Sequence, residues 1–185
     1  MKNPVENWFG EKFETLDPLL QDLHRHGGEL SGTVKLEFGV GLGALIGRRL
    51  AQKLDLPLVA GTHKFDVSIT HTDSALHWSR CFDSHHKMVS VFVPHGTYPT
   101  GSWSETTGSL ALILGVEVKD GGWYWIQREV RFLGIPLPLF LFPSSKAYKR
   151  INQGKYEFSV TFALPFIGKL VSYEGLLTPT VKIVP

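Results

Sequence analysis

The hydrophobic pattern of this chain changes its period near Lys64, and this change limits the possible folds more than any other feature. Before it, over residues 42–54, apolar side chains recur at the three- and four-residue spacing of a helix. After it, apolar and polar residues alternate, first at Phe65, Val67 and Ile69. A period of two is typical of strands with one buried face. The sequence therefore predicts helices in the first third and a sheet in the rest.

The alternation predicts about eight strands in chain order, which favours antiparallel pairing. The expected strands lie over residues 33–38, 64–70, 76–83, 88–93, 110–118, 123–132, 155–164 and 170–177. We predict an α+β fold, with a mostly antiparallel, strongly curved β-sheet or calycin-like barrel and N-terminal helices. A chain of 185 residues suits a single domain over 1–185. Residues 1–57 would form a helical cap plus the first strand, and residues 58–185 the antiparallel sheet.

The first predicted helix has clear start and stop signals. Asp17 is a good N-cap, Pro18 suits the first helical position, and Gly27-Gly28 ends the helix. A second helix is expected over Gly41–Leu54.

A glycine run, Gly39–Ala44, precedes this second helix and fits the G-x-G-x-x-A variant of the dinucleotide-binding fingerprint. A dinucleotide-binding domain needs repeated strand–helix–strand crossovers. No helical pattern recurs between strands after Leu54. We therefore interpret the run as a strand-to-helix corner packed closely on the sheet, and we expect no cofactor.

The charge balance argues against several classes of partner. Lys and Arg number 19 and Asp and Glu number 17, a net charge of +2. This balance gives no electrostatic reason to expect a nucleic acid or an anionic membrane as partner. The longest uncharged apolar runs are Phe38–Gly47 and Leu133–Pro143. Both are shorter than the roughly 20 residues that span a bilayer, so we expect no transmembrane segment.

Cysteine and histidine usage adds two expectations. The single cysteine, Cys81, forms no intrachain disulfide, and the N-terminus lacks the apolar core of a signal peptide. We therefore expect a cytoplasmic protein. His24-x-His26 and His71-x-Asp73 are the closest approaches to metal-ligand spacing. Neither matches a known motif, so scattered surface histidines are the simpler interpretation and no metal is expected.

A charged side chain on an apolar strand face marks the best candidate site. Trp78, Arg80 and Phe82 share one face of a predicted strand, which places a guanidinium between two aromatic rings. A buried charge must be paired or solvated. Its partner is either a glutamate, with Glu105, Glu129 and Glu174 as candidates, or the carboxylate or phosphate of a ligand.

A proline-rich apolar segment, residues 134–143, is the second notable feature. Its prolines exclude a regular helix and a central strand. It is either a buried crossing over one end of the barrel or an exposed apolar lid or rim where a lipid or hydrophobic partner docks.

Several of these stretches resemble a bacterial family of domains of unknown function. The resemblance rests on Trp78-x-Arg80-x-Phe82, Glu105, Pro136-Leu137-Pro138 and the stretch from Phe158 through Pro165, Gly168 and Tyr173 to Leu177. Family members show Phe-x-Ser after the arginine strand, where this chain has Met88-Val89-Ser90. Such domains occur alone or fused behind saccharopine-dehydrogenase-like NAD(P)-dependent reductases. The resemblance implies service to a redox partner, and it supplies no catalytic residues.

The leading functional prediction is a domain that binds a small hydrophobic or acidic ligand in the concave face of the sheet. Arg80 would anchor the polar head, and Glu105 would orient the arginine. Trp78, Phe82 and Trp103 would line the wall, with Tyr173 nearby. One alternative is an enzyme acting in the same pocket, with Glu105 or Tyr173 as general acid or base. Another is a protein-interaction module that serves a reductase.

Overall fold

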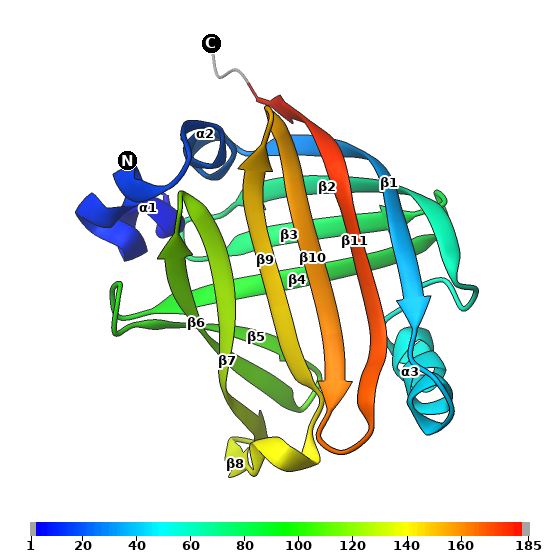
Figure 1. Ribbon diagram of the computed structural model, residues 1–185. Coiled ribbons are helices and arrows are strands. Elements are labelled where there is room, and N and C mark those ends of the chain that lie inside the picture. Colours follow the sequence, from blue (N-terminus) through cyan, green and yellow to red (C-terminus); the bar gives the residue numbers. More distant parts are fainter. Residues whose placement is uncertain (1–2, 183–185) are drawn as a thin grey trace.

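A closed antiparallel β-barrel forms the body of the protein (Figure 1). The computed structural model describes residues 3–182. Ten strands form a ring in the order β6-β5-β4-β3-β2-β1-β11-β10-β9-β7, and pairing of β6 with β7 closes it. The strands are β1 (Gly28–Phe38), β2 (Gly61–His71), β3 (Leu76–Phe82), β4 (His86–His95), β5 (Ser102–Thr107), β6 (Leu110–Lys119), β7 (Gly122–Phe132), β9 (Ser144–Asn152), β10 (Lys155–Leu164) and β11 (Gly168–Val181). A short strand, β8 (Ile135–Leu137), pairs with the end of β7 outside the ring.

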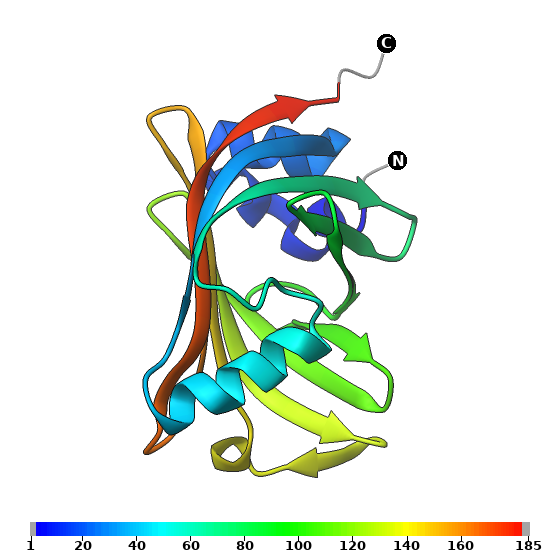
Figure 2. The same cartoon turned by 90° about the vertical axis from the view of Figure 1, so that its right-hand side faces the viewer.

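The helices lie at the two ends of the barrel. At one end, here called the helical end, are α1 (Pro4–Phe9), the 3₁₀ helix η1 (Gly10–Thr15) and α2 (Pro18–His26) (Figures 1 and 2). At the opposite end, here called the α3 end, are α3 (Leu42–Lys53), β8 with the 3₁₀ helix η2 (Leu139–Leu141), and the turn between β10 and β11. None of the helices within residues 3–182 is long and apolar enough to cross a membrane.

The barrel and its N-terminal helices confirm the predicted architecture, but the strand count of about eight was too low. The prediction missed β5, β9 and the short β8. In β9 the inward-facing positions hold Ser145, Ala147 and Lys149, which give no apolar alternation. The barrel pairing of its neighbours, β7 and β10, holds this segment in the sheet despite its polar sequence.

Aromatic side chains fill the barrel interior beneath the helical end. Trp8 from α1 packs on Trp103 from β5, with ring centroids 5.4 Å apart. Trp103 packs in turn on Trp123 of β7 at 6.1 Å, and Trp123 on Trp125 at 5.0 Å. Phe9 joins the same cluster through Trp123. Because aromatic rings bury large areas, this cluster joins the helices to the barrel and closes its interior at that end.

The glycine run forms the tight strand-to-helix corner that we predicted. A Cβ on Gly39 would lie 1.8 Å from the Lys169 carbonyl oxygen, and one on Gly47 would lie 2.0 Å from that of Leu170. Both distances are shorter than any real contact, so only glycine lets α3 lie directly on the backbone of β11. Leu50 of α3 and Leu54 at its end pack against the core, whereas Leu42 and Leu45 are exposed.

The two ends of the described chain meet at α2. The Asn3 side-chain amide donates hydrogen bonds to the carbonyl oxygens of His24 and Arg25, at 2.6 and 3.0 Å. The Lys182 N–H donates to the Gly27 carbonyl oxygen at 3.2 Å. Both ends of the described chain are therefore fixed at the helical end.

Candidate functional site

A cavity of about 290 Å³ lies inside the barrel, between the aromatic core and the α3 end. Leu112, Leu114, Phe158 and Phe162 are typical of its mostly apolar walls. Its lining includes Leu50, Lys53 and Leu54 of α3 and Phe142 and Pro143 after η2. A pocket with apolar walls and a few polar groups is the usual form of a small-molecule site.

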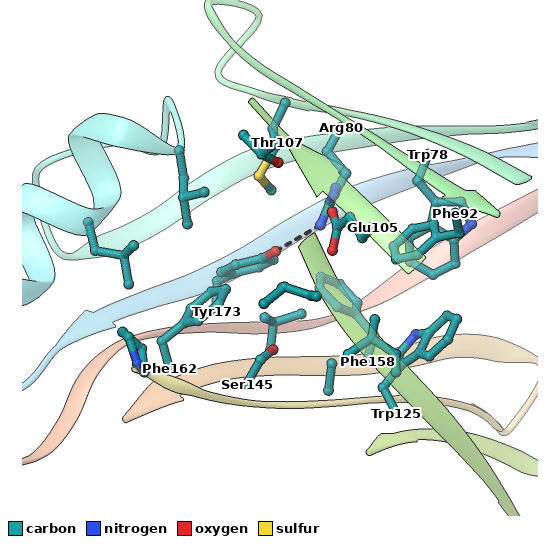
Figure 3. Close-up of a pocket in the computed structure, with 18 of the residues that line it drawn as sticks. Trp78, Arg80, Phe92, Glu105, Thr107, Trp125, Ser145, Phe158, Phe162 and Tyr173 are labelled. Atoms are coloured by element: carbon teal, nitrogen blue, oxygen red, sulfur yellow. Dashed lines mark hydrogen bonds between the residues drawn. The ribbon is translucent and has the colours of Figure 1, made fainter. Parts of the chain in front are cut away.

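Four of the six predicted ligand-binding residues line this cavity, namely Trp78, Arg80, Glu105 and Tyr173 (Figure 3). The other two, Phe82 and Trp103, are fully buried in the packed core and lie outside the lining. Phe82 packs on Phe65 and Tyr173, and Trp103 packs on the tryptophan cluster. Trp78, Arg80 and Phe82 share the inward face of β3, but its far end, at Phe82, lies beyond the open part of the interior.

Arg80 is held by neutral hydroxyl groups. One guanidinium nitrogen donates to the Tyr173 hydroxyl at 3.2 Å, and the other donates to Ser90 Oγ. The Nε–H is buried and has no partner. No carboxylate among residues 3–182 forms an ion pair with Arg80. The structural interpretation of Arg80 as half of an internal ion pair therefore has no partner residue here.

Glu105 lies in the same cavity and does not pair with Arg80. It comes from β5, opposite Phe92 of β4 and Leu112 of β6. Its carboxylate has no hydrogen bond or ion pair within residues 3–182, and Figure 3 shows it projecting toward the cavity near Arg80. The other glutamates considered are engaged or distant: Glu129 pairs with Arg131 on the surface, and Glu174 lies outside the cavity lining. The site thus holds a carboxylate and a guanidinium that are not bonded to each other.

Tyr173 supplies a neutral hydroxyl beside Arg80. Burial raises the pKa of Tyr173, and the neighbouring Arg80 charge opposes that shift only partly. The phenol is therefore protonated at neutral pH. Since its oxygen accepts from Arg80, its own proton remains available to a ligand atom in the cavity.

A buried lysine and histidine lie between the cavity and the helical end, and sequence reasoning missed this pair. Lys149 of β9 is 1% exposed and His24 of α2 is fully buried. Lys149 Nζ lies 2.7 Å from His24 Nε2, and 3.7 and 4.3 Å from the ring centroids of Trp123 and Trp78. Burial lowers the pKa of Lys149 well below its usual value. Burial also lowers the pKa of His24, and Lys149 and His71 add to that shift.

The proline-rich segment is exposed, not buried, so the first of its two interpretations was wrong. Ile135, Pro136, Leu139, Phe140 and Leu141 all lie on the surface of the α3 end. The segment turns inward only after η2, at the cavity-lining Phe142 and Pro143. Prolines are compatible with this exposed position, since β8 is a short edge strand with few backbone hydrogen bonds to its neighbour.

The fold and cavity together define a ten-stranded antiparallel barrel with an internal, mostly apolar pocket. Within residues 3–182, no group of three His, Cys, Asp or Glu side chains is arranged to hold a metal ion. The model of the family described as "Domain of unknown function (DUF4166)" matches residues 16–177, so the chain belongs to this family. Neither the curated proteins nor the solved structures contain a match to this chain.

Proposed function

We propose that this domain binds a small apolar molecule in the barrel cavity, with the polar head of that molecule held at Arg80. The observation that carries the proposal is an arginine without a carboxylate partner in a mostly apolar cavity. An unpaired charge in such surroundings is costly unless another group solvates it. A ligand oxygen placed against the guanidinium supplies the missing acceptor, while its apolar part contacts Phe158 and Leu112.

The two hydrogen-bond donors beside the open space favour a head with acceptor oxygens. Arg80 and the Tyr173 hydroxyl both point toward the cavity (Figure 3). Glu105 would repel a second negative charge, so it limits the head to a single anionic group. We infer that the ligand is an apolar molecule with one carboxylate or a comparable acceptor group.

Native mass spectrometry of the protein as purified is the first test, followed by extraction of any bound molecule. The quantitative test displaces a fluorescent probe, 1-anilinonaphthalene-8-sulfonate, with decanoate and with 1-decanol. A hydrogen bond to a charged group contributes about 1.5–3 kcal/mol. Arg80→Met should therefore weaken decanoate binding roughly 10- to 100-fold. It should weaken decanol binding clearly less, because the uncharged hydroxyl loses a hydrogen bond but no charge–charge attraction. Glu105→Gln should strengthen decanoate binding.

Arg150→Met is the matched control, because Arg150 lies on the outer surface and pairs with Glu157. It should change neither affinity. Failure of both decanoate and decanol to bind would overturn the proposal. Equal losses of folding stability and of binding in Arg80→Met would assign Arg80 a structural role instead.

The alternative of a solid interaction module is less well supported, because the barrel interior is not filled. We infer that any reductase partner, which the family resemblance implies for bacterial relatives, would exchange a hydrophobic substrate with this cavity. A cytoplasmic setting agrees with the free thiol of Cys81.

A further inference from the structure

The two longest uncharged apolar runs of the sequence meet at the α3 end of the barrel. Residues 38–47 form the end of β1 and the start of α3, and residues 133–143 form β8, η2 and their flanks. Figures 1 and 2 both place α3 and the β8–η2 segment at this end, with the β10–β11 turn beside them. Segments about 90 residues apart in the chain therefore contribute to one surface.

Large apolar side chains on this surface point into solvent. Leu42 and Leu45 on α3 are 59% and 52% exposed, and Leu133 and Phe140 are 69% and 65% exposed. Phe166, in the β10–β11 turn, is fully exposed. We call these five residues the apolar rim. Exposed apolar groups gathered in this way mark an interaction surface.

Backbone geometry shows that two rim residues are held outward at a cost. Leu133 and Phe166 have φ values of +50° and +66°, in the left-handed region that bulky side chains rarely adopt. The other non-glycine residues with positive φ among residues 3–182 are polar: Asp55, Asp83, Ser84, Asp120 and Gln153. Polar residues and glycine suit such turns. The turns at the α3 end thus carry apolar tips where the usual turn residues would be more stable.

Basic residues lie beside the apolar rim on α3, although the net charge of the chain is close to zero. The sequence of α3 contains Arg48, Arg49 and Lys53 and no acidic residue. None of the three forms an ion pair within residues 3–182, whereas nearby Glu37 is paired with both Lys35 and Lys169. Lys53 also lines the cavity and remains exposed, as does Thr107 at the end of β5. The cavity therefore opens beside the basic helix.

We propose that the α3 end docks on the surface of an anionic lipid bilayer, with the apolar rim in the headgroup region and α3 against the lipid phosphates. An interfacial helix with basic and apolar groups on its exposed side binds such surfaces in two ways. Its apolar groups are buried among the lipids, and its basic groups are attracted to the anionic headgroups. The rim consists of separate tips on α3, on η2 and on two turns, which suits insertion between lipids better than a match to one protein surface. In its second part the proposal rests on the proposed function: the docked cavity opens toward the bilayer and takes its apolar ligand from it.

Vesicle sedimentation tests the docking. The full chain is mixed with vesicles of phosphatidylcholine alone, or of phosphatidylcholine with 30% phosphatidylglycerol. Binding is expected to the anionic vesicles and to weaken as salt screens the charges. The double variant Leu133→Asn and Phe166→Asn should lose at least tenfold in affinity. Asparagine tolerates the left-handed backbone, so this variant should fold at least as stably as the natural chain.

Two further variants complete the design. Arg49→Glu with Lys53→Glu should remove the preference for anionic vesicles. Gln153→Asn is the matched control, because Gln153 has φ +49° in the β9–β10 turn at the helical end; it should bind vesicles like the natural chain.

Binding that the rim variant retains would overturn the proposal, and so would the absence of binding to anionic vesicles at millimolar lipid. Self-association of the natural chain that the rim variant abolishes would also overturn it, since a second copy would then cover the rim. Displacement of the fluorescent probe is measured on the same variants. If the probe binds while vesicles do not, docking fails and the proposed cavity function stands.

Discussion

Lys149 Nζ lies 2.7 Å from His24 Nε2 and joins the barrel wall to helix α2 through two buried titratable groups. The rings of Trp78 and Trp123 cover the amine, and no carboxylate within residues 3–182 pairs with it. A buried amine that lacks a counter-charge favours its neutral form. The contact between helical cap and barrel therefore depends on pH.

The first prediction concerns this lysine. The unfolded chain holds the Lys149 proton up to about pH 10.4, whereas burial lowers the pKa in the folded protein. Between the lowered pKa of Lys149 in the folded protein and its pKa in the unfolded chain, the unfolded state binds more protons. The free energy of unfolding should therefore rise with pH in this range, by at most about 1.4 kcal/mol per pH unit. Lys149→Met should flatten this rise between pH 7 and pH 9.5, measured by urea unfolding. Lys155→Met, at an exposed lysine, should keep the slope of the natural chain.

The second prediction concerns the stability of the fold at acidic pH. Burial first, and then the charge of Lys149, lowers the pKa of His71 to about 4. Since an unfolded histidine titrates near 6.5, the contribution of His71 is complete above that pH and is lost as the pH falls toward 4. We expect a loss of about 1–2 kcal/mol from His71 after allowing for its partial exposure. His71→Gln should reduce the loss, and the exposed-site variant His26→Gln should not. An unchanged acid slope in His71→Gln would contradict this assignment.

The third prediction tests the contact between α3 and β11. Gly47→Ala would place a Cβ 2.0 Å from the Leu170 carbonyl oxygen. The helix must then move away from the strand, at a cost of about 1–3 kcal/mol. Leu45→Ala in the same helix removes an exposed side chain and should change the unfolding midpoint little. A loss below about 0.5 kcal/mol in Gly47→Ala would show that α3 shifts freely on the strand.

The fourth prediction tests the cavity without removing a charge. Ala147 lines the cavity from β9, so Ala147→Phe should fill part of it and weaken decanoate binding at least tenfold. Filling an existing space should leave stability equal or higher. Ala111→Phe on β6, outside the cavity lining, is the control. Retained binding in Ala147→Phe would place the ligand elsewhere.

The sequence predicted most of the fold because hydrophobic period and turn residues act locally. Asp17, Pro18 and Gly27 defined α2. The alternation in β3 also showed that Trp78, Arg80 and Phe82 share one face of that strand. Closure of the ring through β9 could not be predicted from the sequence, because that strand has a polar sequence and depends on its neighbours for pairing.

The site was predictable only in part, for the same physical reason. Arg80 and Glu105 line one cavity. The sequence left the partner of Arg80 open between three glutamates and a ligand, and no carboxylate within residues 3–182 forms an ion pair with it. Whether two opposite charges meet depends on strand stagger around the barrel, which local patterns do not specify. Lys149 was overlooked because a lysine in a polar segment carries no signal of burial. Only the surrounding tryptophans, distant in the sequence, show that it is enclosed.

Asn3 and Lys182 are both bonded at the C-terminal end of α2, opposite the apolar rim. A tag, surface linker or second domain joined to either end of the described chain would therefore attach at the helical end and leave the α3 end free. Immobilised through a terminus, the barrel would remain accessible to vesicles and to dissolved ligands alike.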